Sequence, residues 1–259
     1  MRERLGRAWR VLATGLCFAT FGAGSVLLGA LVFPLVRLAV RRRDRRVAIA
    51  RRVIRATFRF FVGLMRATGV LSVEVRGLER LHGGGRLILA NHPTLIDVVL
   101  LMALVERGDC VVKGALGRNP ITRGPVKAAG FVFNDDGGED LLADCVGSVR
   151  AGNNLIIFPE GTRSSRTEPL RLQRGAARVA VHGGLDITPV RITCTPATLA
   201  KGEKWYAVPA RRPHFRLVVG EAIAVSPFIA AAPHPALAAR HLTRHLTDYF
   251  SKEHELASA

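Results

Sequence analysis

The hydrophobic pattern of the chain begins with an uncharged run from Val11 to Val36. This run is longer than the roughly 20 apolar residues that a helix needs to cross a hydrocarbon core. It also exceeds the apolar part of a usual cleaved signal peptide, and a basic segment of helical character follows it. We therefore interpret it as a retained membrane helix, which either spans the bilayer or re-enters one leaflet.

Both flanks of this run are basic, but to different degrees. Four Arg precede the run, and six follow it between residues 37 and 46. Because Lys and Arg favour the cytoplasmic side, the bias predicts a protein of the inner (cytoplasmic) membrane whose later domain faces the cytoplasm.

A helix with two contrasting faces is predicted over residues 45–68. Arg52, Arg55, Arg59 and Arg66 recur at spacings of three, four and seven, which places them on one face. Apolar residues fill the other side. Such a basic amphipathic helix suits a bilayer interface, with its Arg near lipid phosphates. The alternative is a helix that packs on a core and exposes its Arg to water.

From residue 72 the pattern alternates between strands and helices. Strands are predicted at 72–77, 86–90, 110–112, 131–133, 154–158, 186–192 and 214–223. Helices are predicted at 95–107, 137–150, 175–184 and 235–252. The alternation predicts an α/β fold with a mostly parallel sheet covered by helices. Residues 1–70 then form a membrane anchor and interfacial helix, and residues 71–259 the α/β domain.

Charge is distributed unevenly along the chain. Of the formal net charge of +18, residues 1–70 carry +13, because they contain fifteen Arg against only Glu3 and Asp44. This excess indicates an anionic partner, either a membrane or a nucleic acid. The Arg surround an apolar run, and the later domain lacks the aromatic and basic runs that stack bases. Membrane lipids are therefore the predicted partner, and nucleic acid is not.

The cysteines and histidines indicate neither a disulfide framework nor a metal site. The four Cys are scattered and form no C-x-x-C pair, which agrees with a reducing compartment. The eight His form no ligand cluster along the sequence. We predict no bound metal, and the pattern carries no signal of an oligomeric state.

The first candidate site is N-H-P-T-L-I-D, Asn91 to Asp97, directly after the predicted strand 86–90. Open α/β sheets place ligands at the carboxyl ends of their strands. A neutral His92 is able to take a proton from an attacking hydroxyl, with Asp97 holding its tautomer if a helix begins after Pro93. The alternative is a plain helix start, with Thr94 as the N-cap and Asp97 in the first turn.

The second candidate site is F-P-E-G-T-R-S, Phe158 to Ser164, directly after the predicted strand 154–158. Gly161 permits a tight loop, Thr162 and backbone amides are hydrogen-bond donors, and Arg163 suits a phosphate. Glu160 is able to accept a hydrogen bond from a hydroxyl group of a substrate. The alternative is a tight Pro-Gly turn with exposed charges.

Together, the order and spacing of these motifs resemble the lysophospholipid acyltransferase family, which includes PlsC-type 1-acyl-sn-glycerol-3-phosphate acyltransferases. The resemblance covers about residues 70–225 and implies that His92 is a general base, with Asp97 as its orienting partner. It also implies that Glu160 and Arg163 contact the acceptor. The matching blocks are His92–Asp97, Gly130–Phe133, Phe158–Ser164 and Ile187–Ile192.

One position departs from that family. Phosphatidate-forming members carry an Arg three residues after the second block, and this chain has Asp136 there. A carboxylate repels a phosphomonoester, which favours acceptors such as a lyso-ornithine lipid or a specialised polyene or glycolipid. The other candidate substrate contacts, beside Glu160, are Asn91, Gly161 and Thr162, with Lys113, Arg163 and Arg174 as anion contacts.

The resemblance implies direct transfer of a fatty acyl group from acyl-CoA or acyl carrier protein (ACP) to a hydroxyl. The thioester is a co-substrate, and no cofactor is predicted. No G-x-S-x-G elbow is present, so a covalent acyl-enzyme is not required. Two alternatives remain open: an inactive membrane-bound scaffold, and a hydrolase in which water replaces the acceptor.

Overall fold

A computed structural model describes residues 2–134, 138–165 and 169–258, and for residues 2–5 and 252–258 it describes the backbone alone. Asp136 lies outside the described residues. Seven strands form one sheet in the order β1-β7-β6-β2-β5-β3-β4. The strands are β1 (Ser72–Arg76), β2 (Leu87–Ala90), β3 (Gly108–Val112), β4 (Val132–Phe133), β5 (Asn154–Ile157), β6 (Ile187–Thr195) and β7 (His214–Val219).

The sheet is mostly parallel. Each neighbouring pair runs parallel except β6 and β7, which are antiparallel with Ile192 opposite Leu217. The carboxyl ends of β2 and β5 therefore lie side by side, and both candidate motifs follow these strands directly. The predicted α/β fold with a mostly parallel sheet is confirmed.

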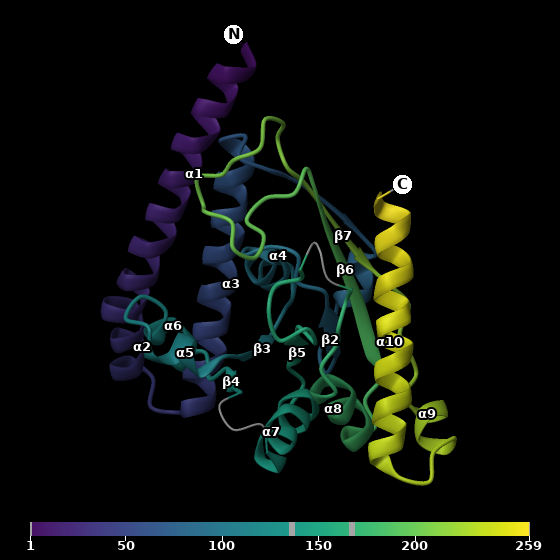
Figure 1. The fold of residues 1–259 in the computed structure, drawn as a ribbon. Coiled ribbons are helices and arrows are strands. Elements are labelled where there is room, and N and C mark those ends of the chain that lie inside the picture. The colour runs from purple at the N-terminus through teal and green to yellow at the C-terminus, as the bar shows by residue number, and fades with distance from the viewer. Residues whose placement is uncertain (1, 135–137, 166–168, 259) are drawn as a thin grey trace.

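The N-terminal segment is helical as predicted. Helix α1 (Arg2–Leu27) continues through a π-helical turn (Leu28–Val32) into α2 (Phe33–Ala39), and α3 (Arg43–Ala67) returns beside it (Figure 1). The stretch Gly6–Ala39 is long and apolar enough to cross a membrane, although a signal sequence would pass the same test. In α3, Arg52, Arg59 and Arg66 are exposed, whereas Arg55 is half-buried and pairs with Glu106.

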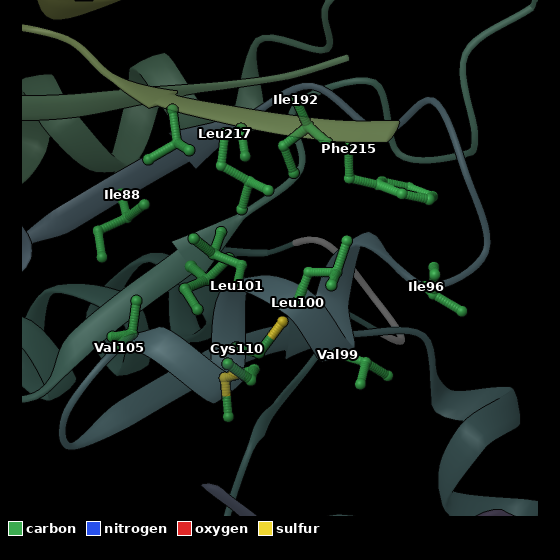
Figure 2. Packing of buried hydrophobic residues seen from close by; sticks show 14 of the residues in the cluster. Ile88, Ile96, Val99, Leu100, Leu101, Val105, Cys110, Ile192, Phe215 and Leu217 are labelled. Carbon is green, nitrogen blue, oxygen red and sulfur yellow. The ribbon is translucent and has the colours of Figure 1, made fainter. Parts of the chain in front are cut away.

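Helices cover both faces of the sheet (Figure 1). The helices after the N-terminal segment are α4 (Asp97–Leu104), α5 (Gly114–Arg118), α6 (Arg123–Ala128), α7 (Glu139–Arg150), α8 (Gly175–Gly183), α9 (Ser226–Ala230) and α10 (Pro235–Ser258), with a 3-10 turn at Leu78–Leu81. One core lies between the sheet and α3 and α4, and the other between the sheet and α7, α8 and α10. Figure 2 shows Phe215 and Leu217 of β7 pointing toward Leu100 and Leu101 of α4.

Some predicted boundaries differ from the observed ones. The helix predicted at 95–107 spans only Asp97–Leu104, because residues 91–96 form a loop held by side-chain hydrogen bonds. The strand predicted at 214–223 ends at Val219, where Gly220 lies against Tyr249. Helices α5, α6 and α9 were not predicted, because they are short and contain Gly or Pro, which form helices poorly.

Candidate active site

The loop between β2 and α4 brings His92 and Asp97 together. Asp97 is the first residue of α4 and is fully buried, and its Oδ2 lies 2.9 Å from Nδ1 of His92. Thr94 donates to the same carboxylate from its backbone N–H and from its hydroxyl, each at 2.6 Å. The expected N-cap role of Thr94 is wrong, because Ile96 is the N-cap of α4 and makes no side-chain cap bond. Thr94 instead fixes the carboxylate that faces the histidine.

The contact between Asp97 and Nδ1 favours one tautomer of His92 when the carboxyl group is ionised. An ionised Asp97 accepts a hydrogen bond from Nδ1–H, which leaves the lone pair on Nε2 available as a base. Burial raises the pKa of Asp97, while the hydrogen bonds from His92 and Thr94 act in the opposite direction. The ring of Phe158 lies beside the imidazole, with 4.5 Å between the centroids.

Glu160 connects the two motifs. Its Oε1 accepts a hydrogen bond from the backbone N–H of His92 at 2.8 Å and one from the hydroxyl of Ser164 at 2.9 Å. The N–H of Ser164 in turn donates to the carbonyl of His92 at 2.7 Å. Burial raises the pKa of Glu160, and the bond from His92 opposes that shift. Glu160 and the Ser164 backbone thus brace the main chain of His92 from both sides.

Arg163 is also engaged inside the protein. Its Nη1 donates to the carbonyls of Leu199 and Ala200 at 3.1 and 2.9 Å. The backbone N–H of Leu95 donates to the same Leu199 carbonyl at 3.0 Å. Leu199 has a φ of +55°, a left-handed conformation that is rare for a leucine. The segment after β6 is therefore tied to both motifs, a connection that no local sequence signal indicated.

Of the remaining predicted substrate contacts, one is bonded inside the protein and four are exposed. The amide of Asn91 bonds both the N–H and the carbonyl of Ile192, at 2.7 and 2.9 Å, and so joins β2 to β6. Gly161 and Thr162 are exposed, and Gly161 has a φ of +67° in a tight turn. Lys113 and Arg174 are exposed residues that directly precede α5 and α8. Roles for all of them in substrate binding stay predictions.

The part of the chain that carries both motifs resembles proteins of known family. Residues 72–193 match the acyltransferase family model. The chain is 32% identical over 124 residues to a 1-acyl-sn-glycerol-3-phosphate acyltransferase of Helicobacter pylori, covering 46% of this chain and 52% of that protein. It is 28% identical over 151 residues to one of Pseudomonas aeruginosa, covering 53% and 56%. The chain thus spans about half the length of the curated relatives it matches.

The fold has a counterpart among solved structures. The crystal structure of the 1-acyl-sn-glycerophosphate acyltransferase PlsC from Thermotoga maritima superposes with a TM-score of 0.70, at 19% identity, over 98% of both chains. That likeness concerns the fold, whereas the family model extends over both motifs of the site. Over residues 72–193, which hold both motifs of the site, the chain is therefore similar to the acyltransferase family that includes these 1-acyl-sn-glycerol-3-phosphate acyltransferases.

Proposed function

We propose that this protein is a membrane-associated O-acyltransferase, which transfers a fatty acyl group from acyl-CoA or acyl-ACP to the hydroxyl of a lysophospholipid-like acceptor. The observation that carries the proposal is the bond between Nδ1 of His92 and the buried Asp97, which leaves Nε2 as the base. The names of the relatives, both 1-acyl-sn-glycerol-3-phosphate acyltransferases, support the reaction class.

In the proposed step, Nε2 of His92 takes the proton of the acceptor hydroxyl as the oxygen attacks the thioester carbonyl. Asp97 stabilises the imidazolium that forms. The tetrahedral intermediate then collapses, the C–S bond breaks, and the imidazolium returns its proton to the departing thiolate. The products are an ester and a free thiol, and the enzyme returns to its starting state without a covalent intermediate.

The N-terminal helices support membrane association. One side of the α1–α2 segment is exposed along its length and carries an apolar stripe: Leu12, Leu16, Val26, Leu27, Leu31, Leu35 and Leu38. Other positions of the segment pack on the protein, where Phe21 contacts Phe58 and Phe61, and Gly29 lies against Gly124. Because α1 lies against the domain rather than projecting from it, we propose that the segment enters one leaflet. The larger number of Arg after the apolar run supports a domain that faces the cytoplasm.

The acceptor is the finer part of the proposal. The relatives' names favour a lysophosphatidate-like lipid, whereas Asp136 in place of an Arg favours an acceptor without a phosphomonoester. Arg163 bonds the carbonyls of Leu199 and Ala200 and is thus partly committed to the protein. We propose a lysophospholipid-like acceptor, with lyso-ornithine lipid and specialised polyene or glycolipid acceptors as the alternatives.

The test is acyl transfer by the detergent-purified protein with labelled acyl-CoA and acyl-ACP. The acceptors are lysophosphatidate, other lysophospholipids, lyso-ornithine lipid and a total lipid extract, and His92→Ala is run beside the wild type. We expect an acylated lipid that the variant does not form. Free fatty acid as the sole product would indicate a hydrolase. No product with any acceptor would indicate a scaffold, and equal activity of the variant would remove His92 from the mechanism.

A further inference from the structure

The two tryptophans of this chain lie exposed at the same end of the molecule. Trp9 on α1 is 56% exposed, and Trp205, in the loop between β6 and β7, is 46% exposed. Tyr206 is exposed beside Trp205, with 5.5 Å between the ring centroids. Soluble proteins bury most of the surface of a tryptophan, so two exposed indoles at one end indicate a contact surface.

The loop that carries Trp205 is attached to the N-terminal part of α1, and the two run side by side in Figure 1. Arg7 donates from Nε to the carbonyl of Val208 at 3.1 Å, and Arg10 donates to that of Pro209 at 3.3 Å. The ring of Trp205 lies 6.3 Å from that of Phe18. The apolar stripe begins on the same stretch of helix, with Leu12 and Leu16, so the loop lies beside that stripe.

The charge of this loop complements an anionic surface. Residues 201–212 contain four basic side chains and one acidic one, Glu203. The basic residues are all exposed: Lys201, Lys204, Arg211 and Arg212. The ammonium of Lys204 lies 5.5 Å from the centre of the Tyr206 ring. Tryptophan and tyrosine beside Lys and Arg are typical of the headgroup layer of a membrane.

We propose that residues 201–212 are a second lipid-contacting element, seated in the headgroup layer of an anionic bilayer beside α1. The inference rests on the proposed membrane association and extends it to a segment far from the N-terminal helices in sequence. An acidic carrier protein would also meet the basic residues, but the exposed indole and the adjoining apolar stripe favour lipid. The loop begins at the Leu199 and Ala200 carbonyls held by Arg163, so the lipid contact lies next to the candidate site.

The chain allows a direct test, because each tryptophan can be observed alone. Trp9→Phe leaves Trp205 as the sole tryptophan, and Trp205→Phe leaves Trp9 as a reference on α1. Each full-length variant is reconstituted into vesicles of phosphatidylcholine and phosphatidylglycerol, with acyl chains brominated near the headgroup or near the chain end. We expect Trp205 to emit at shorter wavelength than free tryptophan in buffer. We also expect the near-headgroup bromine to quench its emission more than the chain-end bromine does, as for a ring about 5–10 Å deep.

The charge contribution is tested in the same assay. Lys201→Gln with Lys204→Gln should reduce the quenching of Trp205 toward its value in pure phosphatidylcholine vesicles. The matched control, Arg240→Gln with Arg244→Gln, removes two exposed charges from α10 and should leave the quenching unchanged. An effect of the control equal to that of the loop variant would contradict a local lipid contact and overturn the charge argument.

Two outcomes would overturn the proposal. In the first, aqueous iodide still quenches Trp205 in vesicles while lipid bromine quenches Trp9, which would show that the loop faces water. Trp205 that is shielded only when acyl carrier protein is added would assign the surface to a protein partner. Acyl transfer measured in the same vesicles separates this inference from the proposed function. If acyl transfer occurs while Trp205 is exposed to water, only the lipid-contact inference is wrong. If Trp205 is buried in lipid but no acyl transfer occurs, only the proposed enzymatic function is wrong.

Discussion

Arg51 of α3 and Asp109 of β3 form a buried ion pair, with 2.7 Å between Nη2 and Oδ2 and side chains that are 8% and 2% exposed. The same guanidinium donates from Nε to the carbonyl of Ala129 at 2.9 Å, and Ser148 donates to Asp109 at 2.5 Å. Burial raises the pKa of Asp109, and the Arg51 charge opposes that shift. The pair therefore joins the basic helix to the sheet and to the turn before β4.

Removing one partner of this pair should destabilise the protein strongly. Arg51→Met leaves the Asp109 carboxylate buried without its counter-charge, so we expect the free energy of unfolding to fall by about 3–5 kcal/mol. Arg51→Met combined with Asp109→Leu removes both charges and should regain much of that loss. Denaturant unfolding in detergent measures both variants. A double variant as unstable as the single one would show that packing, rather than the uncompensated charge, dominates.

Asp97→Asn should impair catalysis while the fold persists. An amide at position 97 no longer holds the Nδ1–H tautomer or stabilises the imidazolium, so we expect kcat to fall by about 10²–10⁴-fold. The acceptor KM should change little, because Asp97 is buried away from solvent. Thr94→Val, which removes only the hydroxyl bond to the carboxylate, should have a much smaller effect. Full activity of Asp97→Asn would show that Asp97 serves only to begin the helix and has no part in catalysis.

Variants of Glu160 distinguish two roles for its carboxylate, support of the His92 backbone and contact with the substrate. Glu160→Ala leaves the N–H of His92 without its acceptor, and we expect transition-state stabilisation to fall by about 1–3 kcal/mol, or roughly 5–150-fold in kcat/KM. Glu160→Gln keeps an oxygen for that bond and should retain most of the activity. Steady-state kinetics with varied acceptor gives the answer. If both variants raise the acceptor KM equally, the carboxylate contacts the acceptor instead.

The contact between Gly29 and Gly124 predicts how the N-terminal segment is held on the domain. A Cβ on Gly124 would lie 2.5 Å from the Cα of Gly29, so Gly124→Ala should separate the π-helical turn from α6 and cost about 1–3 kcal/mol. Gly22→Ala is the matched control, because a Cβ there meets nothing within 4 Å and favours the helix. Thermal unfolding and limited proteolysis of α1 compare the two. Equal behaviour of both variants would argue against a close helix contact.

The sequence alone determined the features that depend on local pattern. The uncharged run and the Arg spacing of residues 45–68 predicted two N-terminal helices, because both signals repeat within a few turns. The alternation from residue 72 predicted the α/β class, and the two motifs were placed at the ends of strands. His92 and Asp97 are five residues apart, so a single turn into α4 was enough to bring them together.

Contacts between distant segments were decided only by the tertiary structure. The spacing of Arg52, Arg55, Arg59 and Arg66 gave no reason to expect that Arg51 pairs with Asp109, 58 residues away. Glu160 was predicted as a substrate contact, but it bonds the backbone of His92, 68 residues earlier, and its role in binding stays untested. Such partners depend on the strand order, which places β2 beside β5 and β6. Because many strand orders are compatible with one alternating pattern, local periodicity cannot select among them, and only the packed sheet does.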